Sequence, residues 1–235
     1  MNDEEIKPSN YTFVSLGTVF LWVSWLFFNG GSTLTMFNGR HDNTPRVIMN
    51  TMMAAGPAGI VAQFLKPRLL YSEHHYEIGA LCNGILVGLI SVTGAADSIS
   101  SHVAILIGVI GGFVYILGCK IAMKLEVDDP VEAWIVHGCG GMWGVLATGF
   151  FHEYKGLIPF QDGGEDFEHR AKFFGVQVLG IVTIIVWTVS ISLPYFLFMR
   201  KFNLLRISQL DEILGDDIQE MGEPLPKFEE EVLLD

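Results

Sequence analysis

The stretch DDPVEAWIVHGCGGMWG, residues 128–144, decides the fold. It places His137, an ionisable side chain, deep inside a long apolar segment and surrounds it with glycines. A group that can gain a charge near physiological pH is costly in hydrocarbon, so its presence there indicates a functional site. Gly138, Gly140 and Gly141 allow another helix or a small permeant to come close. The combination favours a conduction path over an enzyme pocket.

The composition is that of a membrane protein. Hydrophobic residues make up 50% of the 235-residue chain and charged residues only 17%, which excludes a water-soluble domain. A helix rises ~1.5 Å per residue, so about 20 apolar residues are needed to cross the ~30 Å hydrocarbon core. Charge-poor stretches of that length predict six transmembrane helices, at 11–37, 46–65, 77–95, 102–123, 130–151 and 173–199.

The predicted fold class is therefore all-α, a polytopic membrane protein with six transmembrane helices. Residues 1–10 form a polar N-terminus, residues 11–199 the membrane domain, and residues 200–235 an acidic tail. The fifth helix has the clearest predicted start, because Asp129 can cap it and Pro130 suits its first turn.

Basic residues predict the orientation, since Lys and Arg accumulate on the side from which a membrane protein is inserted. With six crossings, the side that holds both termini carries nine of the 14 Lys and Arg residues: Lys7, Lys66, Arg68, Lys120, Lys124, Arg200, Lys201, Arg206 and Lys227. The other five lie opposite: Arg40, Arg46, Lys155, Arg170 and Lys172. Both termini are therefore expected inside, meaning the cytosol or a mitochondrial matrix. The acidic tail argues against nucleic acid or anionic lipid as its partner.

We expect neither a metal site nor a cofactor. Cys82, Cys119 and Cys139 fall in predicted helices without metal-ligand spacing, which favours packing roles. The acidic residues of loop 151–172 are irregularly spaced and are interpreted as a hydrated outer loop. An enzyme is the least favoured class, because no nucleophile with a nearby base stands at depth and no phosphate-binding glycine loop occurs.

Small residues recur at spacings of three and four, which predicts tightly packed helices. The clearest sets are Gly84 and Gly88; Gly108, Gly111 and Gly112; and Gly138, Gly141 and Gly144. Near the end of the first helix, Asn29, Ser32 and Thr33 offer hydrogen bonds beside two glycines. Irregular backbone at that depth is tolerated only beside protein or a wet cavity.

Four motifs in order carry a resemblance to a known family. They are WLFFNGGS (25–32), NT (50–51), NGILVGLISVT (83–93) and the stretch 128–144. Together they span about residues 20–150 and closely resemble the ammonium transporter/Rh family. The stretch from Asp128 through His137 is the most specific of the four.

The resemblance implies a channel-like transporter in which two five-helix halves of inverted topology enclose a narrow pore. Such proteins are usually homotrimers. Ammonium is recruited at an outer vestibule, passes a phenylalanine gate and loses its proton near two facing histidines. By position, Ser32 would belong to the recruitment site, Phe28 to the gate, Trp25 to the pore wall and His137 to the histidine pair. A neutral imidazole can accept from or donate to a small amine, while a dry pore penalises bare cations.

The chain resembles only the second half of that fold, with its last helix. The missing half would carry the partner histidine, a buried aspartate and another gate phenylalanine. Three hypotheses stay open. Another chain supplies the five missing helices, and both together transport ammonium or ammonia. Alternatively, the half-fold is a non-transporting structural subunit of a larger, for example mitochondrial, membrane complex. In the third, the chain is an incomplete product of an ordinary transporter.

Overall fold

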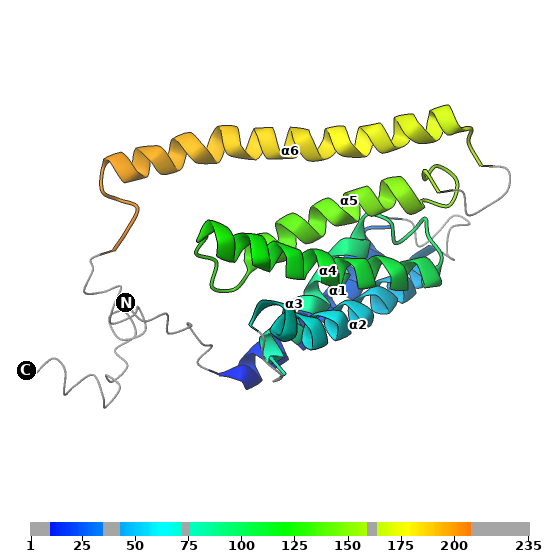
Figure 1. The fold of residues 1–235 in the computed structure, drawn as a ribbon. Coiled ribbons are helices and arrows are strands. Elements are labelled where there is room, and N and C mark those ends of the chain that lie inside the picture. The colour runs from blue at the N-terminus through cyan, green and yellow to red at the C-terminus, as the bar shows by residue number, and fades with distance from the viewer. Residues whose placement is uncertain (1–9, 35–42, 72–75, 159–163, 208–235) are drawn as a thin grey trace, which may run out of the picture. The chain divides into compact units, whose positions relative to one another are not determined.

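The computed structural model describes residues 10–34, 43–71, 76–158 and 164–207, and within them the regular structure is helical throughout (Figure 1). The elements are α1 (Tyr11–Gly31), α2 (Asn43–Leu70), α3 (Ile78–Thr93), α4 (Ser101–Leu125), the π-helical turn η1 (Trp134–Cys139), α5 (Gly140–Phe151) and α6 (Phe167–Lys201). The chain divides into two compact units, Met1–Ile181 and Val182–Asp235. The predicted N-terminus and most of the predicted tail lie outside the described residues.

The helices fall where the six apolar segments predict them, which confirms an all-α membrane fold. Four are long and apolar enough to cross a membrane: α1, α2, α4 and α6. The third, α3, is shorter at 16 residues. The fifth segment consists of η1 followed directly by α5.

Several predicted boundaries are wrong. The first helix ends at Gly31, not at residue 37, and the sixth begins at Phe167, not at residue 173. The second helix does not end at residue 65; it continues to Leu70 with Lys66 and Pro67 buried inside it. The fifth does not begin at Pro130, because the backbone is irregular until Ala133. The predicted cap is nevertheless present: the Asp129 carboxylate accepts hydrogen bonds from the backbone N–H groups of Ala133 (2.9 Å) and Trp134 (3.0 Å).

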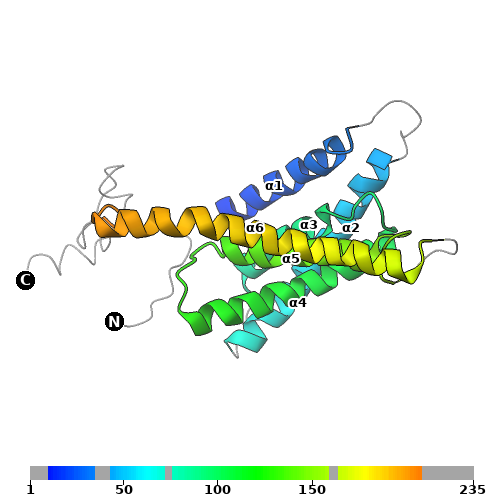
Figure 2. The ribbon, with the colours of Figure 1, turned by 90° about the horizontal axis from the view of Figure 1, so that it is seen from above.

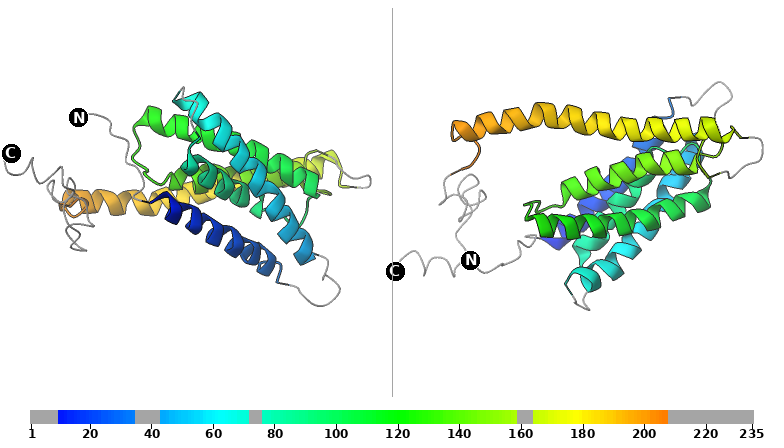
Figure 3. Two further views of the ribbon diagram at one scale, coloured as in Figure 1. Left: turned by 90° about the horizontal axis from the view of Figure 1, so that it is seen from below. Right: turned by 45° about the horizontal axis from the view of Figure 1, so that its top comes forward.

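Helix α3 is the centre of the first unit and contacts α1, α2, α4, α5 and η1. Figures 2 and 3 show α1 and α4 on opposite sides of it. Glycines allow this close packing: a Cβ added at Gly88 would lie 2.5 Å from the carbonyl oxygen of Ala54, and one at Gly144 would lie 2.8 Å from that of Ser91. Gly84, Gly108, Gly111 and Gly112 are similarly crowded, so the predicted small-residue faces of α3 and α4 are helix contacts.

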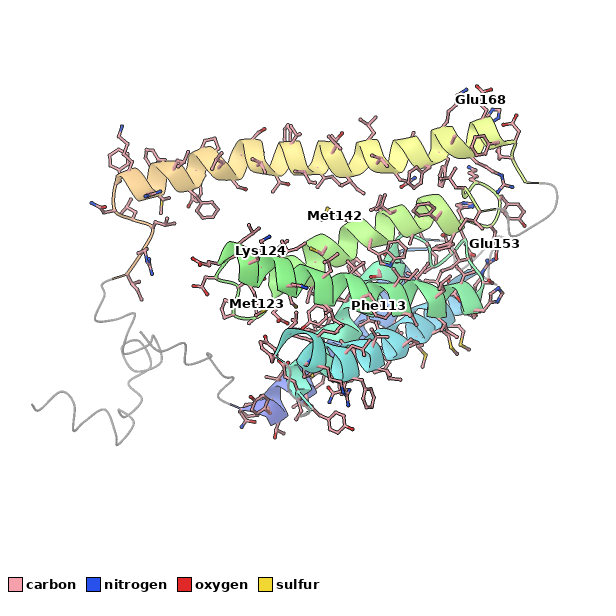
Figure 4. The ribbon with its side chains drawn as sticks, in the orientation of Figure 1. Phe113, Met123, Lys124, Met142, Glu153 and Glu168 are labelled. Carbon is pink, nitrogen blue, oxygen red and sulfur yellow. The ribbon has the colours of Figure 1, made fainter. Side chains whose placement is uncertain are left out.

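A polar network closes the end of the bundle at which α5 finishes. The Arg46 guanidinium donates to the carbonyl oxygen of Ile99 (3.0 and 2.8 Å) and pairs with Glu153, which follows α5 (Figure 4). Asn50, fully buried, donates to the carbonyl oxygens of Ala96 (2.9 Å) and Ile99 (2.8 Å). These bonds satisfy backbone carbonyl groups in the loop after α3, which have no hydrogen-bond partner within a helix. Buried polar groups in a low-dielectric setting need such partners.

Much of the surface is apolar, as expected for helices that face lipid or other apolar chains. Phe113 and Met123 project from α4 and Met142 from α5, and all three are exposed (Figure 4). Of the 35 residues of α6, only Arg170 is buried. In water such surfaces would aggregate, whereas a bilayer covers them without cost.

Candidate functional site

Three of the four predicted pore residues lie together. The ring of Trp25, on α1, has its centroid 5.8 Å from that of Phe28 and 6.4 Å from that of His137 on η1. Phe28 is 60% exposed and His137 is also exposed, whereas Trp25 is half-buried. Trp25 therefore bridges two segments that are more than 100 residues apart in the sequence.

Ser32 lies one helical turn beyond Phe28, at the end of α1. Its hydroxyl donates to the carbonyl oxygen of Phe28 (2.6 Å), a bond within its own helix. The backbone N–H of Ser32 reaches the same oxygen at 3.0 Å. Ser32 thus extends the row that begins at His137 and passes through Trp25 and Phe28.

Trp25 is oriented by a hydrogen-bond network that sequence reasoning missed. Its indole Nε1–H donates to the Thr93 hydroxyl on α3 (3.0 Å), and that hydroxyl donates to the carbonyl oxygen of Leu89 (2.8 Å). One turn along α1, the Asn29 amide donates to Thr51 on α2 (3.0 Å) and, at 3.4 Å, to Thr93. The motifs at residues 25–32 and 83–93 were both recognised in the sequence, but nothing in the sequence showed that Trp25 and Thr93 are in contact.

His137 sits in an unusually wide helical turn. The N–H of Gly140 bonds to the carbonyl oxygen of Ile135, five residues back, which defines η1 as π-helical. Ile135 is buried against α4, where a Cβ added at Gly118 would lie 2.6 Å from its side chain. The wide turn leaves His137 on the opposite, exposed side. Single π-helical turns within helices occur often at functional sites.

The surface around His137 is open. A Cβ added at Gly138 would meet only the ring of Trp134, at 3.8 Å, and one added at Gly141 would meet nothing within 4 Å in the described parts of the chain. Of the set Gly138, Gly141 and Gly144, only Gly144 packs closely against another helix within the described residues of this chain. We call the surface of Trp25, Phe28, His137, Gly138 and Gly141 the open face.

A buried charge cluster lies just before η1, and the sequence interpretation did not find it. The Glu132 carboxylate accepts from Lys66 Nζ (2.7 Å), from Asn83 Nδ2 (2.7 Å) and from the Tyr115 hydroxyl. Lys66 is only 2% exposed and also reaches Glu77 at 3.3 Å. The available signal was one charged residue at the margin of each of two apolar segments, Lys66 after 46–65 and Glu132 near the start of 130–151. Only the three-dimensional structure shows that the two residues pair.

The arrangement offers hydrogen-bonding chemistry for a small polar solute. The imidazole of His137 can accept or donate a hydrogen bond, and its neighbours are aromatic rings and glycines. Among the residues that the structure describes, no three His, Cys, Asp or Glu side chains gather as a metal site, and the three cysteines are unpaired.

Comparisons with known proteins agree with these motifs. The model of the Ammonium Transporter Family matches residues 1–225. Ammonium transporter MEP2 of Saccharomyces cerevisiae is 34% identical over 92% of this chain and 44% of its own length. Ammonium transporter 1 member 1 of Arabidopsis thaliana is 33% identical over 92% of this chain and 46% of its own length.

Solved structures show the same relationship. The crystal structure of Saccharomyces cerevisiae Mep2 superimposes with a TM-score of 0.73 and 32% identity, over 88% of this chain and 46% of that one. A structure described as a sensor Amt protein gives a TM-score of 0.77 and 31% identity, over 93% and 52%. This chain thus spans about half the length of the relatives it matches, and it belongs to the ammonium transporter family.

Proposed function

We propose that this chain is one half of an ammonium-conducting pore and that it works when a complementary five-helix half covers the open face. The observation that carries the proposal is the row of His137, Trp25 and Phe28, linked by ring contacts on the open face of the first unit. An imidazole is not expected on a surface that faces lipid, because placing an ionisable group in hydrocarbon is costly. Facing a second wall, the same group can bind ammonia.

In the proposed pore, each residue of the row has one role. Ser32 belongs to the outer end, where ammonium is recruited, and Phe28 gates the entrance. Trp25 forms the wall, and His137 meets the permeant after its proton has left. The dry aromatic lining disfavours a bare cation and passes the neutral amine more readily. The matched length of about half a relative supports the need for a second wall.

The direct test of the partner is gentle solubilisation of the native membrane, isolation of this chain, and mass spectrometry of what co-migrates. We expect a chain that carries the complementary half, with a partner histidine, and a particle mass that corresponds to three such pairs. Recovery in a large complex that lacks any such half would contradict the proposal. That result would favour the alternative, a structural subunit in which neighbouring helices or lipid fill the former pore.

A further inference from the structure

We propose that Glu132 is a positioning residue for His137, because it anchors the start of η1 and so holds the imidazole beside Trp25. The inference rests on the proposed function, in which His137 meets the permeant. It adds a group that does not touch the permeant and that lies outside the row of pore residues.

The side chain of Glu132 is fixed from three helices at once. Oε1 accepts from Lys66 on α2 (2.7 Å), whereas Oε2 accepts from Asn83 on α3 (2.7 Å) and from the hydroxyl of Tyr115 on α4. Lys66 and Tyr115 are fully or almost fully buried, at 2% and 0% exposure. Charge-assisted hydrogen bonds are the strong ones in proteins, and a low-dielectric surrounding strengthens them further.

The backbone carries this anchor into η1. The carbonyl oxygen of Glu132 accepts the N–H of Val136 at 2.9 Å. The Asp129 carboxylate accepts the N–H groups of Ala133 and Trp134, the two residues that follow Glu132. His137 follows Val136 directly. The first turn of η1 therefore has little freedom to rotate unless Glu132 moves.

Glu132 is also in a strained conformation. Its φ is 58°, in the left-handed region that a non-glycine residue adopts only at a cost. Such strain persists where the surroundings over-determine a conformation, and it clusters at functional sites. The polar contacts of the side chain with Lys66, Asn83 and Tyr115 supply that constraint. Without them, relaxation of φ would turn η1 and move the imidazole away from Trp25.

A second ion pair makes it possible to separate positioning from general stability. Arg46 and Glu153 also form an ion pair, and Glu153 is 9% exposed. Glu153 lies in the turn after α5, and Arg46 also donates to the carbonyl oxygen of Ile99 in the loop after α3. Both carboxylates stabilise the bundle. Of the two residues, only Glu132 bonds to the backbone of η1, through its main-chain carbonyl oxygen, which accepts the N–H of Val136.

The test compares Glu132→Gln with the matched control Glu153→Gln in the native assembly. The full chain, labelled at histidine and tryptophan, is studied by solid-state NMR in lipid bilayers, and His137 is assigned by loss of its signals in His137→Gln. The two readouts are the ring nitrogen shifts of His137 and its cross-peak to the Trp25 indole. Ammonium flux is recorded in parallel as a function of pH.

In Glu132→Gln we expect shifted or split His137 signals, a weaker Trp25 cross-peak and a displaced pH profile. A hydrogen bond to a charged group is worth about tenfold or more in an equilibrium constant, so the displaced state becomes visible. Glu153→Gln should leave the His137 signals and the pH profile unchanged. If Glu132→Gln does not fold, Tyr115→Phe removes one donor and should give the same changes in smaller measure.

Unchanged His137 signals in the folded Glu132 or Tyr115 variant would overturn the proposal, as would equal changes in Glu153→Gln. The NMR readout does not depend on transport. An assembly of the wild-type chain without ammonium flux would contradict the proposed function, while the effect of Glu132→Gln on His137 would still decide the positioning role.

Discussion

At the scale of single residues, Trp25 links the framework to the open face. Its indole N–H bonds to Thr93 while its ring contacts Phe28 and His137. The resemblance to a family motif predicts a place in a pore for Trp25, Phe28 and His137, and the structure brings these three side chains together. Thr93 could not be predicted as their support, because a hydroxyl on the last residue of a helix carries no sign of its partner. That contact depends on how α1 crosses α3.

Replacing Thr93 with valine should destabilise the fold, because the Trp25 N–H loses its acceptor at a half-buried site. An unsatisfied buried donor costs about 1–3 kcal/mol. Denaturation of the protein in detergent, followed by tryptophan fluorescence, measures the loss. Thr18→Val is the matched control: Thr18 is buried, and its hydroxyl bonds within its own helix, to Val14. Equal stability losses in the two variants would contradict a special role for Thr93.

At the scale of helices, apolar length predicted the six segments, but the ends of α2 and α5 depended on tertiary contacts. Lys66 and Pro67 resemble a helix end in sequence, yet Glu132 neutralises the lysine and allows α2 to continue to Leu70. The wide turn of η1 was equally hidden. Its Ile135 packs against α4 at Gly118, and the ion-paired Glu132 lies just before it.

The close contact between α2 and α4 requires a glycine at position 108. Gly108→Ala should destabilise the bundle by about 1–3 kcal/mol, because its Cβ would overlap the carbonyl group of Ala54 and force α2 and α4 apart. Gly17→Ala is the control, since nothing in the described structure lies within 4 Å of its added Cβ. Thermal unfolding in detergent distinguishes them. A Gly108→Ala protein as stable as Gly17→Ala would refute the close α2–α4 contact.

The turn after α5 should be sensitive to acid. His152 Nδ1 accepts the backbone N–H groups of Tyr154 (3.2 Å) and Lys155 (3.3 Å), which requires a neutral ring. Burial, and then the charge of Lys155, lowers the pKa of His152 below its ordinary value of 6.5. In this pH range the folded protein therefore binds fewer protons than the unfolded one. The free energy of unfolding falls as the pH drops below 6.5. His152→Gln should flatten the pH dependence of unfolding, and an unchanged slope would contradict the assignment.

At the scale of the whole molecule, the count of crossings decides which side each end faces. Basic residues predict both termini inside, yet α3 has only 16 residues, about 24 Å at ~1.5 Å per residue. Single cysteines at Asn10 and Asn203 should react with an impermeant reagent from one side, and a cysteine at Lys155 from the other. Labelling of Asn10→Cys and Asn203→Cys from opposite sides would mean an odd number of crossings.

The open face is the feature of the whole molecule that no single segment reveals. The fold, the row of ring contacts and the shared length with relatives are the grounds for the proposal that this chain forms one wall of a pore. A bulky residue on this face should preserve the fold and disturb assembly. Gly141→Leu, where an added Cβ meets nothing within 4 Å in the described residues, should unfold like the wild type but co-purify poorly with the complementary half. Undiminished co-purification would show that the partner docks elsewhere.

The central claim is that His137 lines a working ammonium pore. The most direct measurement is ammonium-dependent flux through the native assembly, reconstituted in liposomes, for the wild type, His137→Ala and the control His102→Ala. His102 is exposed at the start of α4 and contacts Ser100. We predict that His137→Ala abolishes flux while His102→Ala retains it. Wild-type flux in His137→Ala would contradict the claim.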